Sequence, residues 1–544
     1  MRRRWLIRVG LVVAGVALSL WLTARPVSEA RSRPIMDSMS NPEDKGAAAF
    51  LGAGFGGISV DALQSNAVPW RLVAAALLLE EQRRNPAAKL DQATLRVILR
   101  RFGFLYPERV LNLPKGVMRH PGDMPLGMTW GDIAPIGGSR VRVANLGCAA
   151  CHAGVTYTAD GVPRPQAAML GMPNSSLDLE AYTQAVYAAL RRHADEPALL
   201  ETAQRLFPDM DWQEQASLRW IVLPLARHRL AALESLGRAT PFPNGAPGST
   251  NGVAALKLAL GTPLIGGGGG DKGVVSIPDL GKCVWRTSLL ADGAYRIPGK
   301  ADRTTAAHDL DARHLNALAA ITSFFTVPSM GVHPDDARSG IGDARNIFTF
   351  LKSYQAQTFP GPLDQVAARR GAAIYVQHCA ACHGVYGWSG PRPVLQRFPN
   401  WIGNVGTDTL RADALDRPLA DAVGKTGYRG LIAVQIGRGY AAPPLAGLWA
   451  SAPYLHNGSV PSLAAMLSPA ERPRRFMVGG HALDWDRVGL RLMPDGSYPP
   501  GYMPFSQPQW IDTSEAGRGN AGHEQGATLS IADKRALIEF LKLL

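Results

Sequence analysis

Apolar residues recur every three or four positions in several segments of the chain, which is the spacing of one face of an α-helix. The segments 179–190, 304–325, 344–354 and 363–377 show this pattern most clearly. Long stretches between them have no such period and are rich in glycine and proline, with 58 Gly and 41 Pro in 544 residues. The pattern predicts a mainly α protein with long irregular loops.

One strong interruption divides the helical segments, at Pro360, Gly361 and Pro362. Because proline cannot continue a helix, we expect a linker at 356–364 between a first domain, 31–355, and a second, 365–544. Ser530 followed by Asp533 is a capping pattern ahead of a last helix. The second domain would then begin and end with a helix. The first would be similar but enlarged by a large insertion.

The first thirty residues have the pattern of a targeting segment. Arg2, Arg3, Arg4 and Arg8 precede the apolar run 9–22, which is short for a membrane-spanning helix. The small-x-small sequence 28–30 resembles a cleavage site but lies far beyond that run. We therefore expect either a signal peptide within 1–30 or an N-terminal membrane anchor at 9–24. Both place the body of the protein in the periplasm or outside the cell.

The net charge of +13 adds little to this interpretation. Lysine and arginine are scattered among acidic residues, and no signature of nucleic-acid binding is present. We expect no nucleic-acid partner. A mildly basic surface favours an acidic redox partner or anionic lipid.

Four of the five cysteines carry the chemistry. Cys148 and Cys151 precede His152, Cys379 and Cys382 precede His383, and both motifs read Cys-Ala-Ala-Cys-His. Two cysteines three apart share one face of a helical turn, where they can form thioethers with the vinyl groups of a haem, and the following histidine can bind the iron. The repetition predicts two covalently bound haems c. The fold class is then two cytochrome c-like haem domains, the first enlarged by an insertion.

Other uses of these cysteines fit the sequence less well. A four-cysteine zinc site would need closer spacing than more than two hundred residues. A thioredoxin-like dithiol would need one such motif beside a βαβ pattern and has no use for the histidine. The fifth cysteine, Cys283, is expected to be a small buried residue.

The sixth ligand of each iron, opposite the motif histidine, decides the function. An iron closed by a protein ligand at this position carries electrons, whereas an iron left open there can react with small molecules. For the second haem, His456 and His523 lie in Gly- and Asn-containing loops, and Met503 is a third candidate. For the first haem, the sequence offers many candidates and no motif: Met169, Met172, Met330, His228, His308, His314 and His333. The residues that could line an open first site are Val284, Trp285, Arg286, Phe324 and Phe325.

The block 443–463, which contains Trp449, Tyr454, His456 and Asn457, resembles the signature of a bacterial dihaem group that includes the rubber oxygenases. More distant members are the dihaem cytochrome c peroxidases and the dihaem protein that oxidises tryptophans during maturation of methylamine dehydrogenase. The resemblance implies that His523 closes the second haem and that His456 is a nearby structural or electron-path residue. It also implies an open first haem, although the Phe and Trp pair of the rubber oxygenases has no unambiguous match here.

Two hypotheses follow for the function. The first is a dihaem oxidoreductase, in which the second haem exchanges electrons with a periplasmic partner and the first activates peroxide or dioxygen, with Trp285 as a candidate pocket residue. The second is an electron-transfer cytochrome with two closed haems and no substrate. It would be a subunit of a membrane complex if the N-terminal segment is retained.

Overall fold

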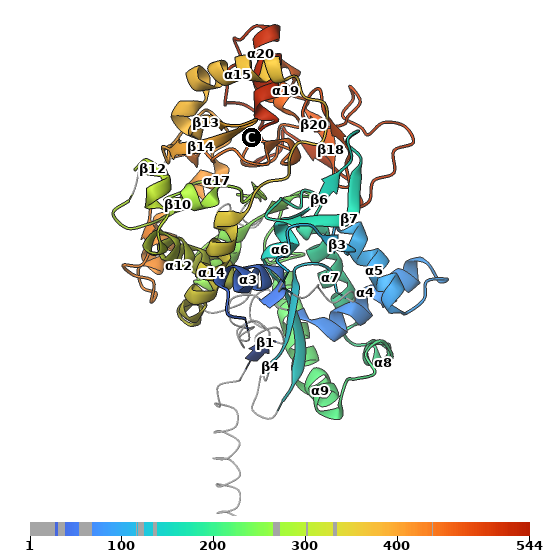
Figure 1. The fold of residues 1–544 in the computed structure, drawn as a ribbon. Helices are drawn as coiled ribbons and strands as arrows, with labels where there is room; N and C mark the ends of the chain where they lie inside the picture. Colours follow the sequence, from blue (N-terminus) through green and yellow to red (C-terminus); the bar gives the residue numbers. More distant parts are fainter. Residues whose placement is uncertain are drawn as a thin grey trace, which may run out of the picture.

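The computed structural model describes residues 28–30, 39–53, 68–115, 117, 124–133, 139–264, 272–300, 303–329, 334–437 and 439–544. Helices make up 41% and strands 16% of the structure, and the strands form several small sheets (Figure 1). The fold is therefore mixed α/β, and the prediction of a mainly α protein built from two cytochrome c-like domains is wrong. The error arose because short strands within irregular loops have no long period of two to reveal them.

The helices follow the predicted segments closely. In chain order they include α3 (Pro42–Ala48), α4 (Trp70–Arg84), α5 (Gln92–Arg101), α6 (Cys148–Cys151), α7 (Leu179–His193), α8 (Pro197–Leu206), α11 (Gly252–Ala259), α12 (Ala312–Ser329), α14 (Ile341–Ser353), α15 (Gln365–His378), α16 (Ala380–His383), α19 (Leu463–Leu467) and α20 (Ile531–Leu541). The helices expected at 179–190, 344–354 and 363–377 are confirmed as α7, α14 and α15. The segment 304–325 becomes helical only from Ala312, after the short strand β12 (Thr305–Ala306).

The strands missed by the sequence analysis follow each Cys-Ala-Ala-Cys-His motif. After the first motif, β6 (Ala153–Tyr157) pairs antiparallel with β7 (Pro163–Leu170), and after the second, β13 (Val385–Ser389) pairs with β14 (Arg392–Phe398). A further sheet contains β1 (Ser28–Ala30), β4 (Met128–Ile133) and β5 (Val141–Leu146). Each motif therefore leads directly into a β-hairpin. The hairpin fixes the direction in which the chain leaves the motif.

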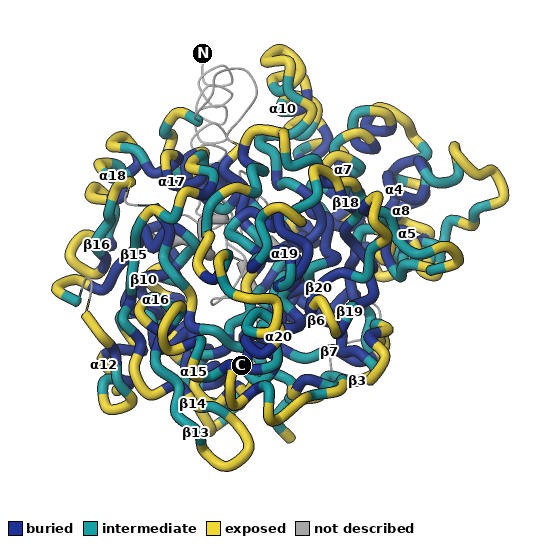
Figure 2. The backbone as a smooth tube through the Cα atoms, turned by 90° about the horizontal axis from the view of Figure 1, so that it is seen from above, coloured by how far each residue is buried: buried dark blue, intermediate teal, exposed yellow. Residues whose placement is uncertain are grey.

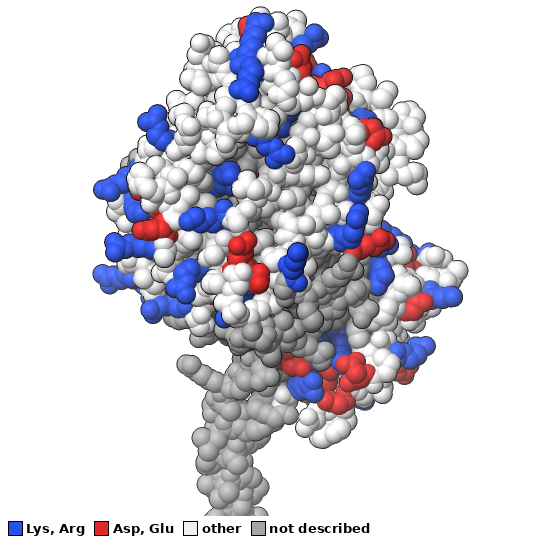
Figure 3. All heavy atoms as spheres, viewed as in Figure 1, with Lys and Arg blue, Asp and Glu red and all other residues white. Residues whose placement is uncertain are grey.

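The buried side chains form two clusters. The smaller joins α4, α5, α7 and α8, and the larger extends from Ala47 to Leu541, with members on both sides of the expected linker at 356–364. Figure 2 shows these buried residues in the interior and the exposed ones at the periphery. The face drawn in Figure 3 carries scattered cations interspersed with acids.

Two helix pairs cross at a glycine in the same way. The α3 helix packs on α14 at Gly46, and α15 packs on α20 at Gly371. A Cβ atom added at Gly46 would lie 2.0 Å from the carbonyl oxygen of Asn346, and one at Gly371 would lie 1.9 Å from that of Ala536. One turn further along each pair, Phe50 contacts Phe350 and Tyr375 contacts Phe540. Both crossings are close because glycine lacks a side chain.

Gly371→Ala should destabilise the protein by about 2–3 kcal/mol, because the added methyl group would overlap the backbone of α20 and force the two helices apart. Chemical denaturation followed by circular dichroism measures this effect. Gly342→Ala is the matched control, since it also lies in a helix, α14, and its Cβ would meet nothing within 4 Å. That control should be neutral or stabilising by about 0.5–1 kcal/mol. Equal losses from both substitutions would contradict the close crossing.

The N-terminal targeting segment lies outside the described residues, apart from β1. Among the helices of the described ranges, none is long and apolar enough to cross a bilayer. The prediction of a signal peptide or anchor in 1–30 therefore stays a prediction.

Candidate haem site

Both Cys-Ala-Ala-Cys-His motifs line one cavity. The cavity has a volume of about 780 Å³, and its walls include Cys148, Cys151, His152, Cys379, Cys382 and His383. This volume lies in the range of cofactor sites, which is roughly 300–1,000 Å³. Residues more than two hundred positions apart in sequence thus surround the same space.

Each motif is a short helical turn, α6 or α16, with small alanines between the cysteines. Ala149, Ala150 and Ala380 are buried. In the first motif the turn lies directly against the backbone of Gly127, where a Cβ atom would be 1.9 Å from the nitrogen of Ala150. The turns therefore carry both sulfur atoms on one side and leave room for a flat group against the backbone.

The thiols of the motifs are free and held in their neutral form. Burial raises the pKa of Cys148, Cys151 and Cys379 to about 12, and also raises that of Cys382. A redox-active dithiol needs a lowered pKa, because the thiolate is its nucleophile. This environment does not fit a thioredoxin-like use. It fits thiols that are consumed once, as thioethers to a haem.

The histidine of each motif is oriented by a proline carbonyl group. His152 Nδ1 lies 3.0 Å from the oxygen of Pro278, and His383 Nδ1 lies 2.9 Å from that of Pro443. A carbonyl oxygen only accepts, so Nδ1 must carry the proton and Nε2 keeps its lone pair for a metal. Burial lowers the pKa of both imidazoles to about 4, so both stay neutral at pH 7.

The two proline carbonyls belong to a repeated loop structure. Residues 278–293 and 443–458 have the same sequence of backbone conformations: Lys282 and Gly447 are left-handed, short 3₁₀ turns follow at Cys283–Trp285 and Leu448–Ala450, and Leu290 and Leu455 are again left-handed. Sequence identity is low, but Pro, Leu, Leu and Gly recur at matching positions. The chain therefore builds the support of each motif histidine twice.

The repeated loops also cross each other reciprocally. The amide of Ser276, just before the first loop, donates to the carbonyl of His456 at the end of the second at 2.7 Å. The amide of Ala441, just before the second loop, donates to the carbonyl of Ala291 at the end of the first at 2.8 Å. The two hydrogen bonds join equivalent positions of the repeat, because Ser276 matches Ala441 and Ala291 matches His456. They hold the two motif histidines in one rigid framework.

A second histidine faces the second motif. The ring centroids of His383 and His523 are 6.0 Å apart. Two imidazoles on opposite sides of one metal would have centroids about 6 Å apart, since each metal–nitrogen bond is about 2 Å and each ring centre lies about 1 Å further back. Arg472 donates to the His523 carbonyl and positions its loop. His523 thus stands where a sixth ligand would be needed.

His456 occupies a different position in the cavity wall. Its ring stacks on Tyr440 with centroids 3.8 Å apart, and its Nε2 is buried without a hydrogen-bond partner. Burial, together with nearby Arg411, lowers its pKa to about 3. The matching residue of the first loop is Ala291, so the repeated loop does not itself require a histidine here. Met503, the third candidate, is exposed at the surface.

The candidates for the first haem are mostly elsewhere. Met169, Met172, His228, His308 and His314 do not line the cavity, and Met330 and His333 lie outside the described residues. Of the expected lining residues, Arg286 faces the cavity. Val284, Trp285 and Phe324 are buried in the core, and the side chain of Phe325 is not among those described. His314 instead donates from Nε2 to the carbonyl of Val284.

The sequence did not indicate several polar groups of the wall, among them Asp279 and Arg411. The Tyr354 hydroxyl lies 3.2 Å from Asp279, and burial raises the pKa of that carboxyl to about 7. Arg411 forms a buried ion pair with Asp292 at 2.8 Å. Burial lowers the pKa of Arg286 to about 10. The repeat at 278–293 and 443–458 was the available signal for this region, since the two loops share Pro-x-Leu and a Gly.

His481, a buried histidine outside the cavity wall, gives an expectation for acid stability. Burial lowers its pKa from 6.5 to about 4. The unfolded chain therefore binds a proton more readily, so stability is retained above pH 6.5 and is lost as the pH falls towards 4. The loss assigned to this residue is about 3 kcal/mol. His481→Gln should show a shallower fall in urea midpoint over this window, and an identical slope would contradict the assignment.

Comparison with known proteins bears on the second loop. The model of a family described as RoxA-like, cytochrome c-like, matches residues 439–477. The chain is also similar to two proteins of Sinorhizobium fredii (strain NBRC 101917 / NGR234), named uncharacterized protein y4iJ and uncharacterized protein y4iM. The first is 30% identical over 265 residues, covering 37% of this chain and 43% of the relative. The second is 29% identical over 176 residues, covering 27% and 39%.

The chain thus matches less than half the length of either relative. The family match supports a RoxA-like cytochrome c relationship, and a cytochrome c-like domain implies covalently bound haem c. The motif residues fit that cofactor by their tautomers, their neutral thiols and the shared cavity. Within the described residues, no cluster of three or more His, Cys, Asp or Glu side chains is placed to hold a metal ion.

Proposed function

We propose that the protein is an exported dihaem c-type oxidoreductase. Cys148, Cys151 and His152 would hold the first haem, and the equivalent residues of the second motif would hold the other. The duplicated support of the motif histidines by Pro278 and Pro443 favours two haems over one, because each imidazole is prepared for a metal in the same way.

The observation that carries the proposal is the difference between the two motif histidines. His383 faces His523 at the spacing of two ligands on one metal. The other histidines in the described cavity wall are His378 and His456, and His456 is stacked on Tyr440. This arrangement supports a closed second iron and an open first one. A haem supplies electron transfer when its iron is closed and activation of peroxide or dioxygen when it is open.

The residues of this chain then have distinct tasks. His523 would occupy the remaining position on the second iron, and that haem would then supply only electron exchange with a periplasmic donor or acceptor. Arg286 places a half-buried positive charge in the wall of the shared cavity, where it can bind an anionic group. The targeting pattern of residues 1–30 supports export to the compartment in which haem is attached to thiols.

A second candidate function is electron transfer with both irons closed. Met128 favours this function, because it is a buried methionine that lines the same cavity. Its neighbour in the chain, Gly127, lies against Ala150 of the first motif. Methionine is a common axial ligand of haem c. Such a protein would need no substrate pocket.

Absorption and electron paramagnetic resonance spectra of the purified protein distinguish the two functions. We expect one low-spin haem and one high-spin haem, and binding of carbon monoxide to one haem after reduction. Two low-spin haems that do not react with carbon monoxide would overturn the oxidoreductase proposal in favour of electron transfer. A single haem per chain would overturn the dihaem assignment itself.

A further inference from the structure

A helical rod at one end of the molecule exposes large apolar side chains. It consists of α9 (Trp212–Ser217), the π-helical turn η3 (Leu218–Val222) and α10 (Leu223–Ser235), which follow one another without a break. Trp212 is 75% exposed and Trp220 is 71% exposed, and Leu225 and Leu236 are also exposed. Tryptophan side chains are rarely this exposed to solvent, so the exposed face of the rod indicates an interaction surface.

The sequence explains why the rod contains a π-helical turn. Pro224 has no amide hydrogen, so the regular hydrogen-bond pattern cannot pass through it. The chain widens into the η3 turn immediately before this proline. The rod keeps only a few side chains buried, among them Leu218, Val222, Leu223 and Leu230.

The outer face combines its apolar residues with positive charge. Of the three arginines in residues 218–236, Arg227 pairs with Asp195 at 2.5 Å and Arg229 lines the haem cavity, so Arg219 is the cation beside the exposed tryptophans. The Arg219 guanidinium lies over the Trp220 ring at 5.2 Å. Tryptophan and arginine together are typical of helices that lie in the interface between a lipid bilayer and water, where the ring enters the headgroup region and the cation meets lipid phosphates.

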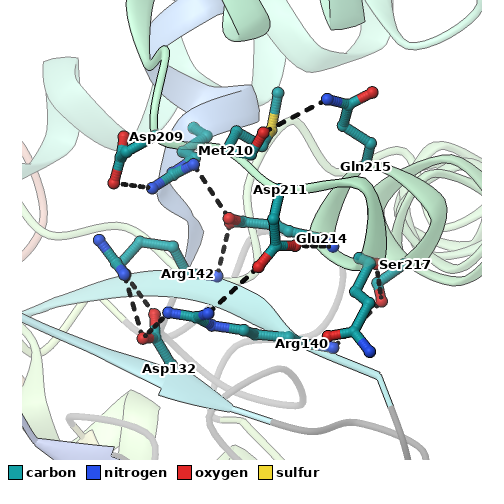
Figure 4. A network of polar contacts seen from close by, with 11 residues as sticks. Asp132, Arg140, Arg142, Asp209, Met210, Asp211, Glu214, Gln215 and Ser217 are labelled. Carbon is teal, nitrogen blue, oxygen red and sulfur yellow. Dashed lines mark hydrogen bonds and ion pairs between the residues drawn. The ribbon is translucent and has the colours of Figure 1, made fainter.

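The rod also lies beside the place where the described chain begins. Strand β1 starts at Ser28 and pairs with the end of β4 at Ile133. The neighbouring residue Arg140 donates its amide to Ser217 of α9 at 3.1 Å, and its side chain bridges Asp132 of β4 and Asp211, the N-cap of α9, at 2.9 and 3.2 Å (Figure 4). Figure 1 shows β1, β4 and α9 at one end of the molecule.

A second layer of ion pairs fixes the rod to the body. Glu214 of α9 accepts from the amide of Arg142 at 2.9 Å and pairs with the buried Arg71 of α4 at 3.0 Å. These partners are nearly inaccessible to water, so their loss would be costly. The exposed tryptophans are therefore held on a rigid support. They lie at the same end of the molecule as β1, where the described residues begin at Ser28.

We propose that the outer face of this rod, from Trp212 to Leu236, rests on a phospholipid bilayer with anionic headgroups. The indole rings of Trp212 and Trp220 enter the headgroup region, and Arg219 contacts lipid phosphate. The inner face of the same rod, including Val222, Ala226 and Leu230, lines the haem cavity. Contact with the bilayer would therefore place one wall of that cavity next to the membrane.

Hydrogen exchange of the full-length protein tests this surface directly. We expect amides of residues 212–236 to exchange more slowly when vesicles of phosphatidylglycerol and phosphatidylcholine are added, and to change less with phosphatidylcholine alone. The double substitution Trp212→Ser and Trp220→Ser should remove this protection and lower partitioning onto the vesicles by roughly tenfold or more. The exchange readout remains informative even if residues 1–27 alone keep the protein on the vesicles.

Trp510→Ser is the matched control, because Trp510 is 41% exposed and also lies under an arginine, Arg475, at 5.0 Å. It should leave exchange and partitioning unchanged. Equal exchange of residues 212–236 with and without anionic vesicles would overturn the proposal, as would lipid-dependent protection of these residues that the double variant retains in full. Protection that increases with protein concentration in the absence of lipid would also overturn it, since the rod would then be an interface between copies of the chain.

Discussion

His523→Ala is expected to convert the second haem from a six-coordinate, low-spin centre into a high-spin centre that binds carbon monoxide after reduction. The reason is geometric, because the rings of His383 and His523 are 6.0 Å apart, and a haem iron held by His383 would take His523 as its second protein ligand at this spacing. The ring is largely buried, and burial lowers the pKa of His523, so its imidazole is neutral at pH 7 and can bind a metal. Absorption and electron paramagnetic resonance spectra of the variant measure the change.

His481→Ala is the control for this experiment. His481 is also buried and has an unpartnered Nδ1, but it does not line the cavity. Its removal should cost stability and leave both haem spectra unchanged. An unaltered low-spin signal in His523→Ala would contradict the ligand assignment, and His456 would then be the next residue to substitute.

The candidate site was predicted from sequence where the chemistry is local. Cys379, Cys382 and His383 are adjacent, so their spacing alone defines a haem attachment motif. The position of His523 could not follow from spacing, because it lies 140 residues further along and reaches His383 through a loop that bonds to Val405. Only the resemblance to a known family selected it over His456.

The sequence did not indicate the residues that contribute to the site through their backbone atoms. Pro278 and Pro443 matter for their carbonyl oxygens, which every residue type possesses, so their identity carries little signal. Asp279 and Arg411 are distant in sequence from both motifs and enter the cavity wall only after the loops have crossed.

The elements of the fold also divide into those that the sequence predicts and those that it does not. Amphipathic helices such as α7 and α14 were readable because one face of each is buried and the other is exposed. The capping pattern at Ser530 was also correct, since its side chain accepts from the amide of Asp533 at 3.1 Å. The short strands were missed because β9 (Val275–Ser276) and β17 (Tyr440–Ala441) pair only where distant loops are brought together. Two-residue strands have no period to detect.

Replacing both cysteines of one motif by alanine should remove one covalent haem and leave the other. The wild-type chain is expected to carry the mass of two haems, and Cys148→Ala/Cys151→Ala and Cys379→Ala/Cys382→Ala the mass of one each. The reason is that the two motifs have separate helical turns and separate histidine supports, although they line the same cavity. Intact-mass measurement after denaturation gives the count.

Cys283→Ala is the matched control, because Cys283 is a free, buried thiol that lines the same cavity but has no second cysteine within one helical turn. It should retain both haems, since a single thiol outside the motif is not positioned for the attachment that Cys-Ala-Ala-Cys-His provides. Loss of both haems from either double variant would mean that the reciprocal contacts of Ser276 and Ala441 make the two sites depend on each other. Loss of one haem from Cys283→Ala would contradict the assignment of attachment to the two motifs alone.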